Sequence, residues 1–195
     1  VFQLREVDEI IFLDITATRD GRRPDFALVE SLARECFVPL TVGGGVKSVE
    51  DVRDLLRAGA DKVSIKSCPA ILPTLAGQFG AQAFVRCFDY PQDAAPDWIA
   101  AVHMAGEYGE VGEILVQSIG RDGSMTGYDL WLLKQSRSAI APFIASGGAG
   151  TYEHFVQAVE AGASAVAAGA MWLFTEQTPL EAKRYMASRG IPVRL

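Results

Sequence analysis

Two halves of the 195-residue chain resemble each other at an offset of about 104 residues. Three pairs of segments match at or near this offset: residues 9–15 and 113–119, 39–44 and 142–148, and 58–63 and 161–166. A fixed internal period is the signature of a repeat architecture. Two copies of a unit with several strand–helix elements predict a barrel made of two half-barrels, because a doubly wound open sheet does not ordinarily repeat in this way.

Short apolar runs alternate with helix-like stretches along the sequence. We expect seven strands, at residues 9–15, 39–42, 62–65, 83–88, 113–119, 143–146 and 163–168. Helices are expected at 26–36, 72–79 and 98–108, with a loop at 91–96. Ser48 reads as the N-cap of a further helix, with Asp51 completing a partial capping box.

Continuous apolar strands separated by helices indicate a parallel sheet that is covered on both faces. We therefore predict an α/β fold, a (β/α)₈ barrel, forming a single domain over residues 1–195. The remaining strand is expected before residue 1, because the second half of the repeat has the fuller complement.

Composition and charge narrow the class of protein. A net charge of −6 without a block of Lys or Arg argues against nucleic acid as a partner. The apolar runs are too short to cross a bilayer, and no basic segment precedes a hydrophobic stretch as in a signal peptide. Cys36, Cys68 and Cys87 lie far apart without metal-ligand spacing, which indicates a reducing, cytoplasmic setting. We expect no membrane contact, no metal and no organic cofactor.

Each half of the repeat places glycines directly after a strand and before a helix, at residues 43–45 and 147–150. Glycines let a backbone approach an anion closely, and the helix N-terminus adds N–H groups and a favourable dipole. A single cluster is equally well explained as a tight turn that needs positive φ. Two clusters at matching positions favour a ligand with two phosphates. The candidate phosphate-binding residues are Gly44, Gly45, Gly147 and Gly148.

Asp14 and Asp89 each follow an apolar strand and are expected to end it. Carboxylates at the carboxyl ends of barrel strands are natural general acids and bases, because active sites lie at that face. A helix N-cap or a loop salt bridge is the alternative for either residue. The segment 121–124, with Gly123, is a further polar loop at that face, and by spacing alone it could be a simple turn.

Glu9, Lys62 and Glu113 sit at or near strand starts. They should therefore gather at the opposite end of the barrel from the active site. Converging charges at that end predict a salt-bridge ring, which could serve only stability.

Ordered motifs across essentially the whole chain resemble the cyclase subunit of imidazole glycerol phosphate synthase. They read DE…LDITA at 8–17, PLTVGGG at 39–45, GADKVSI at 59–65, GEIL at 112–115, DG…GYD at 122–129 and ASGGAG at 145–150. The resemblance implies an ammonia-using lyase of histidine biosynthesis, fed by a separate glutaminase subunit docked at the barrel bottom. Its substrate would be a bisphosphorylated ribulosyl aminoimidazole carboxamide nucleotide. Ammonia attack would split it into imidazole glycerol phosphate and an aminoimidazole carboxamide ribotide.

The resemblance also implies roles for individual residues. Asp89 matches the second of two catalytic aspartates, and Asp14 would be a rim carboxylate that orients substrate. The charged residues at the strand starts, Glu9, Lys62 and Glu113, match a gate of the ammonia channel. The phosphate-binding glycines would be helped by Ser67, Ser146 and Gly123.

Departures from the family pattern keep two other readings open. The first family strand, with its catalytic aspartate, has no counterpart after Val1, and Lys66, Gln117 and Gly120 replace an asparagine, a threonine and an aspartate. Residues 1–9, 14–18, 23–26 and 35–39 also resemble cyclase-like proteins of bacterial surface-polysaccharide gene sets, which are thought to pass ammonia to the amidation of a sugar. A catalytically inert scaffold that only binds a glutaminase is the third reading.

Overall fold

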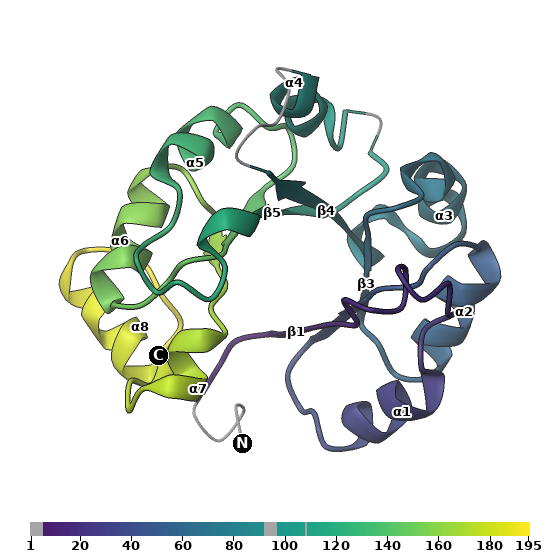
Figure 1. Cartoon of the computed structure of the whole chain (residues 1–195), viewed down its shortest axis with the longest axis horizontal. Coiled ribbons are helices and arrows are strands. Elements are labelled where there is room, and N and C mark those ends of the chain that lie inside the picture. The colour runs from purple at the N-terminus through teal and green to yellow at the C-terminus, as the bar shows by residue number, and fades with distance from the viewer. Residues whose placement is uncertain (1–5, 92–96, 108) are drawn as a thin grey trace. The chain divides into compact units, whose positions relative to one another are not determined.

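The computed structural model describes residues 6–91, 97–107 and 109–195. In these residues seven parallel strands alternate with helices, and the sheet order follows the chain order from β1 to β7 (Figure 1). This is the predicted (β/α)₈-barrel class of fold, with seven of its strands among the described residues. The strands are β1 (Ile10–Leu13), β2 (Leu40–Gly43), β3 (Lys62–Ile65), β4 (Phe84–Tyr90), β5 (Glu113–Ser118), β6 (Phe143–Ser146) and β7 (Ala165–Val166).

The helices follow the strands along the chain. They are α1 (Phe26–Arg34), α2 (Val49–Arg57), α3 (Leu72–Phe79), α4 (Asp97–Met104), α5 (Leu130–Ser136), α6 (Tyr152–Glu160), α7 (Ala170–Phe174) and α8 (Pro179–Ser188). Short 3₁₀ turns lie at Pro69–Ile71, Ala81–Ala83 and Ile119–Arg121. No helix within the described residues combines the length and the hydropathy that a bilayer crossing requires.

Two compact units make up the chain. The first comprises residues 1–87 and 106–113, and the second comprises residues 88–105 and 114–195. The expectation of a single domain stays a prediction, and each unit is described by itself.

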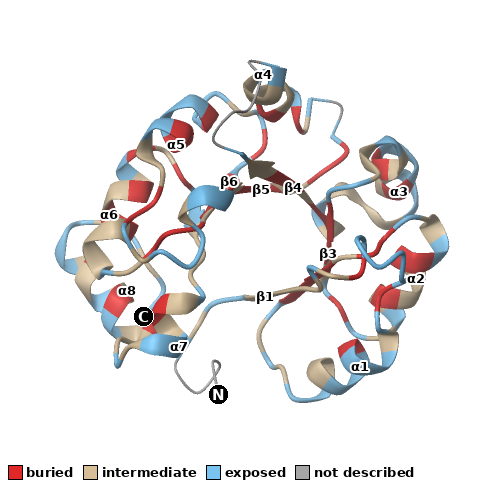
Figure 2. Cartoon of the chain, in the orientation of Figure 1, coloured by how far each residue is buried: buried red, intermediate tan, exposed pale blue. Residues whose placement is uncertain are grey.

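In the first unit, β1 pairs with β2 and β2 with β3 in parallel, with Ile10 opposite Leu40 at the start of the first pair. Figure 2 shows buried positions in β2 and β3 and on helices α1, α2 and α3, whereas β1 is half-buried. Helix α2 begins with the predicted capping box: the Ser48 hydroxyl accepts from the Asp51 N–H at 3.2 Å, and the Asp51 carboxylate accepts from the Ser48 N–H at 3.0 Å. The core of this unit includes Val42, Val52, Leu55, Val63, Leu75 and Phe84.

In the second unit, β5 pairs with β6 and β6 with β7 in parallel, and Gln117 lies opposite Ser146. Helix α6 packs against α8 and β7. The core of this unit includes Ile114, Leu115, Leu132, Phe155 and Met171.

Several expected boundaries were wrong. Strand β4 runs on to Tyr90, so that Asp89 lies within the strand and does not end it. The strand expected at 163–168 contains only Ala165–Val166, although the N–H groups of Ser164 and Ala167 donate to the β6 carbonyls of Phe143 and Ala145 at 2.9 and 2.8 Å. The helix expected at 98–108 covers Asp97–Met104, while residue 108 and most of the loop expected at 91–96 lie outside the described residues.

Candidate active-site residues

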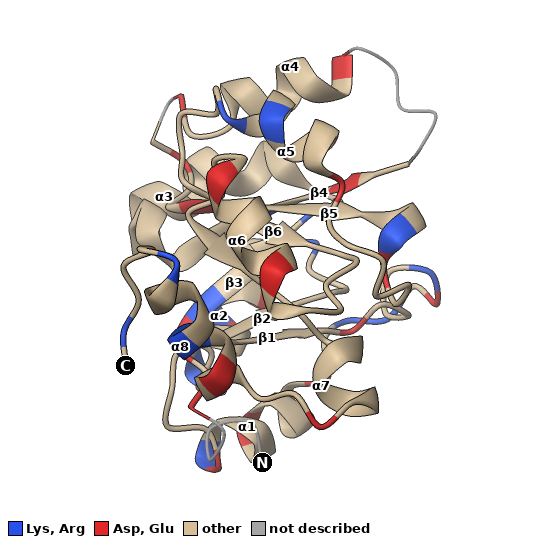
Figure 3. Cartoon of the chain, turned by 90° about the vertical axis from the view of Figure 1, so that its left-hand side faces the viewer, with Lys and Arg blue, Asp and Glu red and all other residues tan. Residues whose placement is uncertain are grey.

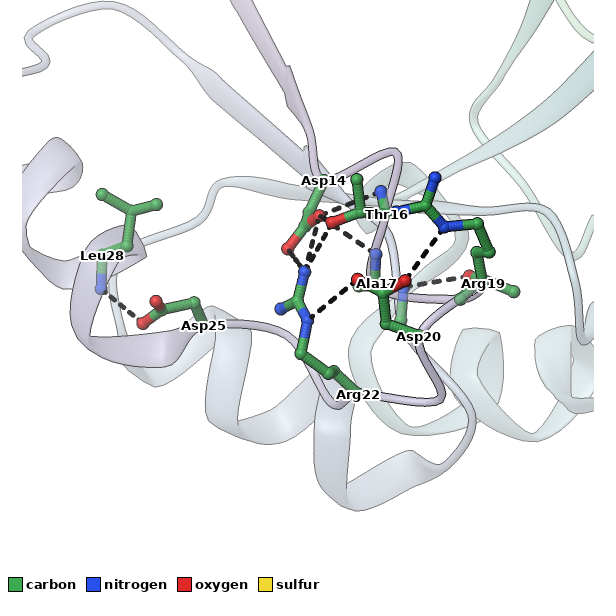
Figure 4. Close-up of polar contacts among 10 residues, drawn as sticks. Asp14, Thr16, Ala17, Arg19, Asp20, Arg22, Asp25 and Leu28 are labelled. Carbon is green, nitrogen blue, oxygen red and sulfur yellow. Dashed lines mark hydrogen bonds and ion pairs between the residues drawn. The ribbon is translucent and has the colours of Figure 1, made fainter.

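Asp14 lies directly after β1 and is held on several sides by the loop that follows it (Figure 4). Its Oδ1 accepts from the Thr16 N–H at 3.1 Å, the Thr16 hydroxyl at 3.0 Å and the Ala17 N–H at 3.1 Å. Arg22 Nη2 lies 3.1 Å from Oδ2. Burial raises the pKa of Asp14, but the hydrogen bonds from Thr16, Arg22 and Ala17 outweigh it and lower the pKa overall.

A carboxylate so bonded stays ionised and holds its loop in place, which is the loop salt bridge that the sequence left open for Asp14. Because this carboxylate already accepts several hydrogen bonds and stays ionised, it is better suited to orient a neighbouring group than to transfer protons. Its place in catalysis stays a prediction.

The first glycine cluster joins β2 to α2, and Gly44 and Gly45 have φ values of 101° and 72°. A Cβ atom at Gly44 would collide with the main-chain carbonyl oxygen of Asp14, and one at Gly45 would lie 2.8 Å from the carbonyl oxygen of Arg22. Close packing of the Asp14–Arg22 loop therefore requires glycine at both positions, whether or not a ligand binds there.

Asp51 fastens the segment between this cluster and α2. Its Oδ2 accepts from the N–H groups of Lys47 and Ser48 at 2.9 and 3.0 Å, and its Oδ1 lies 2.6 Å from Arg23 Nε. Only 4% of its side chain is exposed. Burial raises the pKa of Asp51, but the bonds from Arg23, Lys47 and Ser48 lower it overall. The sequence predicted the cap formed by Ser48 and Asp51 but not the ion pair between Asp51 and Arg23.

The second glycine cluster follows β6, and its glycines also have positive φ and pack closely against a neighbouring loop. Gly147 and Gly148 have φ values of 91° and 108°. A Cβ atom at Gly147 would lie 2.6 Å from the carbonyl oxygen of Ser118, and one at Gly148 would collide with that of Gly127. The N–H of Gly127 also donates to the Gly148 carbonyl at 2.7 Å, so that the glycine cluster and the loop after β5 are joined directly.

His154 holds the start of α6 as Asp51 holds the start of α2. Its Nδ1 accepts from the N–H groups of Gly150 and Thr151 at 3.1 and 3.3 Å. These donors correspond in the repeat to Lys47 and Ser48. The sequence carries a signal for this contact, because residues 48–51 align with 151–154 and place His154 opposite Asp51.

Asp89 is a half-buried residue of β4 in the second unit. Its main-chain carbonyl accepts from the indole N–H of Trp98 at 3.0 Å. The rings of Phe88 and Tyr90, on either side of Asp89, make edge-to-face contacts with the Trp98 ring. These aromatic contacts keep the backbone extended at Asp89, which explains why β4 continues beyond its predicted end.

The remaining candidates lie at or just beyond strand ends. Ser67 is exposed after β3, and Ser146 is the half-buried last residue of β6. Gly123 is exposed, with φ of 73°, in the turn after β5. In the same loop, Asp122 accepts from the side-chain amide of Gln117 at 3.1 Å.

Glu9, Lys62 and Glu113 come together in the first unit, as their positions at strand starts predicted. Lys62 Nζ lies 3.0 Å from Glu9 Oε2 and 3.0 Å from Glu113 Oε2, and 18% of the lysine side chain is exposed. Burial lowers the pKa of Lys62, but its two carboxylate partners outweigh this and raise it. The convergence is confirmed, and the role as a gate stays a prediction.

In the view of Figure 3, acidic and basic positions are mixed, and helix α8 carries both. Within residues 6–91, 97–107 and 109–195, no three His, Cys, Asp or Glu side chains lie close enough together to hold a metal ion.

Comparison with known proteins decides the family. Residues 1–178 match the family model described as histidine biosynthesis protein. The chain belongs to this family. It is 43% identical over 207 residues to the imidazole glycerol phosphate synthase subunit HisF of Endomicrobium trichonymphae, covering 96% of this chain and 79% of that protein. It is 42% identical over 220 residues to the HisF subunit of Mycobacterium tuberculosis strain H37Ra, covering 100% of this chain and 82% of that protein. The chain is thus a member of the HisF group of histidine biosynthesis proteins.

Proposed function

We propose that this protein is the cyclase subunit of an imidazole glycerol phosphate synthase. The carrying observation is the identity of 42% over the full chain to HisF subunits. In this proposal ammonia attacks a bisphosphorylated ribulosyl aminoimidazole carboxamide nucleotide. The adduct loses one water, cyclises and splits into imidazole glycerol phosphate and an aminoimidazole carboxamide ribotide, which is a lyase reaction.

The residues of the two units support this chemistry. Glycine clusters that precede α2 and α6 supply one candidate phosphate site in each half, at Gly44 and Gly45 and at Gly147 and Gly148. Ser67 follows β3 in the first unit, whereas Ser146 ends β6 and Gly123 follows β5 in the second unit. Asp89 would exchange protons with the substrate as ammonia adds and the ring closes.

A separate glutaminase subunit would supply the ammonia. The Glu9–Lys62–Glu113 cluster supports this, because a lysine held by two carboxylates at strand starts can admit ammonia when one of its ion pairs opens. We expect the glutaminase to dock at the end of the sheet where the strands start.

Turnover with ammonium chloride as the nitrogen source tests the proposal. The purified chain should convert the bisphosphate nucleotide, and Asp89→Asn should abolish turnover. Asp25→Asn is the matched control, because Asp25 caps α1 through the Leu28 N–H and asparagine is an equally good N-cap. Full activity of Asp89→Asn would refute the assignment of Asp89.

One observation favours sugar amidation as a second candidate. The side-chain amide of Gln117 donates to the Asp122 carboxylate, and Gln117 stands where the family motif has a threonine. Tight binding of the bisphosphate nucleotide without ammonia-dependent turnover would favour this candidate. Failure to bind the nucleotide would instead favour the inert scaffold.

A further inference from the structure

Trp98 connects helix α4 to the part of β4 that carries Asp89. It lies in the first turn of α4, and its indole Nε1–H donates to the Asp89 carbonyl oxygen at 3.0 Å. Both residues belong to the second compact unit. The contact therefore joins a helix directly to the main chain of the proposed catalytic residue.

The Trp98 ring also packs against both neighbours of Asp89. Its centroid lies 5.9 Å from that of Phe88 and 5.0 Å from that of Tyr90, with interplanar angles of 76° and 72°. These are edge-to-face arrangements, which are favourable for aromatic pairs. Successive side chains of a strand point to opposite faces. Trp98 thus covers the face that carries Phe88 and Tyr90, and the Asp89 carboxylate is directed to the other face.

We propose that Trp98 is a positioning residue that fixes the Asp89 carboxylate for proton transfer. The inference rests on the proposed function, since it assigns Trp98 a role through Asp89. The indole N–H restrains the Asp89 peptide, and the two ring contacts set which way the side chain points. Misplacement of a reacting group by about 1 Å can lower a rate by about 100-fold. Loss of the indole bond should therefore lower kcat much more than it changes KM.

Trp98→Phe tests this, because it keeps an aromatic ring against Phe88 and Tyr90 and removes the N–H donor. Trp131→Phe is the matched control: Trp131 also packs on Tyr90, at 6.0 Å, but it is 55% exposed. We expect Trp98→Phe to lower ammonia-dependent kcat about tenfold or more. KM and the melting temperature should stay close to those of the wild type, and Trp131→Phe should leave kcat within about twofold.

Amide hydrogen exchange at residues 88–90 gives a readout that does not depend on turnover. Exchange there should be faster in Trp98→Phe than in the wild type and unchanged in Trp131→Phe. Wild-type kcat together with wild-type exchange in Trp98→Phe would overturn the inference, and so would a kcat loss matched by a lowered melting temperature. If the wild type does not turn over the nucleotide, the proposed function fails, while exchange still tests whether Trp98 fixes the strand at Asp89.

Discussion

Acidification should weaken the start of α6 and leave the start of α2 intact. The two helix starts are built alike, with a pair of N–H groups held by the side chain three residues after the N-cap. In α2 that side chain is the carboxylate of Asp51, and in α6 it is the imidazole of His154. Only the imidazole changes its charge between pH 5 and 8 at its ordinary pKa.

The expected effect follows from what His154 binds. Its Nδ1 can accept from Gly150 and Thr151 only in the neutral ring with the proton on Nε2. Burial lowers the pKa of His154, and Glu153 opposes this only in part. The folded chain thus binds the proton less readily than the unfolded chain, whose histidine has its ordinary pKa of about 6.5. The stability that His154 contributes is complete above that pH and falls as the pH drops towards the folded pKa.

The loss is limited by what the cap is worth. An N-terminal cap contributes about 1 kcal/mol, which is a factor of about five in the ratio of folded to unfolded chains. His154→Asn keeps an uncharged oxygen acceptor and removes the titration. It should therefore remove most of this pH-dependent loss.

Urea unfolding at pH 7.5, 6.5 and 5.5 measures the effect in the wild type and His154→Asn. The comparison isolates His154, because the only other histidine, His103, and all carboxylates are common to both proteins. The same loss of stability in both proteins between pH 7.5 and 5.5 would refute the role of His154.

Three substitutions test other contacts by the same unfolding measurement. Gly44→Ala should cost about 1–3 kcal/mol or more, because φ is 101° and the new Cβ would collide with a carbonyl; wild-type stability would contradict the steric argument. Lys62→Met should cost about 1 kcal/mol, because two carboxylates 3.0 Å from Nζ lose their cation, and adding Glu113→Gln should recover part of the loss. Tyr128→Phe should cost about 1–3 kcal/mol, because a buried hydroxyl donates to the Ala167 carbonyl at 2.8 Å, and an unchanged free energy of unfolding would exclude that bond as a contributor.

Local patterns in the sequence predicted much of the fold. The strands at Lys62–Ile65 and Phe143–Ser146 and the helix at Leu72–Phe79 have the predicted bounds. The capping box of Ser48 and Asp51 could also be predicted, because its two residues are only three positions apart. The convergence of Glu9, Lys62 and Glu113 could be predicted because parallel strands bring their starting residues to one edge.

Contacts between distant segments could not be predicted in this way. Arg23 is 28 positions from Asp51, and composition gives no sign that the two meet. The extension of β4 through Asp89 depends on Trp98, which lies nine positions further on in a separate helix. Such pairings follow from how loops fold over strand ends, and this is also where the proposed active-site residues lie.

The glycine clusters show why pattern alone does not establish a phosphate site. Two of the four candidate phosphate-binding glycines, Gly44 and Gly148, would collide with a neighbouring carbonyl if they carried a side chain, so turn geometry accounts for them without a ligand. The caps distinguish the two halves further. Asp51 places a carboxylate beside one cluster and is balanced by Arg23, whereas His154 is uncharged while it caps the other. A phosphate near the first cluster would therefore lie beside the Asp51 carboxylate, whose charge Arg23 balances. A phosphate near the second cluster would lie beside the neutral ring of His154. We therefore expect Arg23→Gln to weaken anion binding in the first half alone.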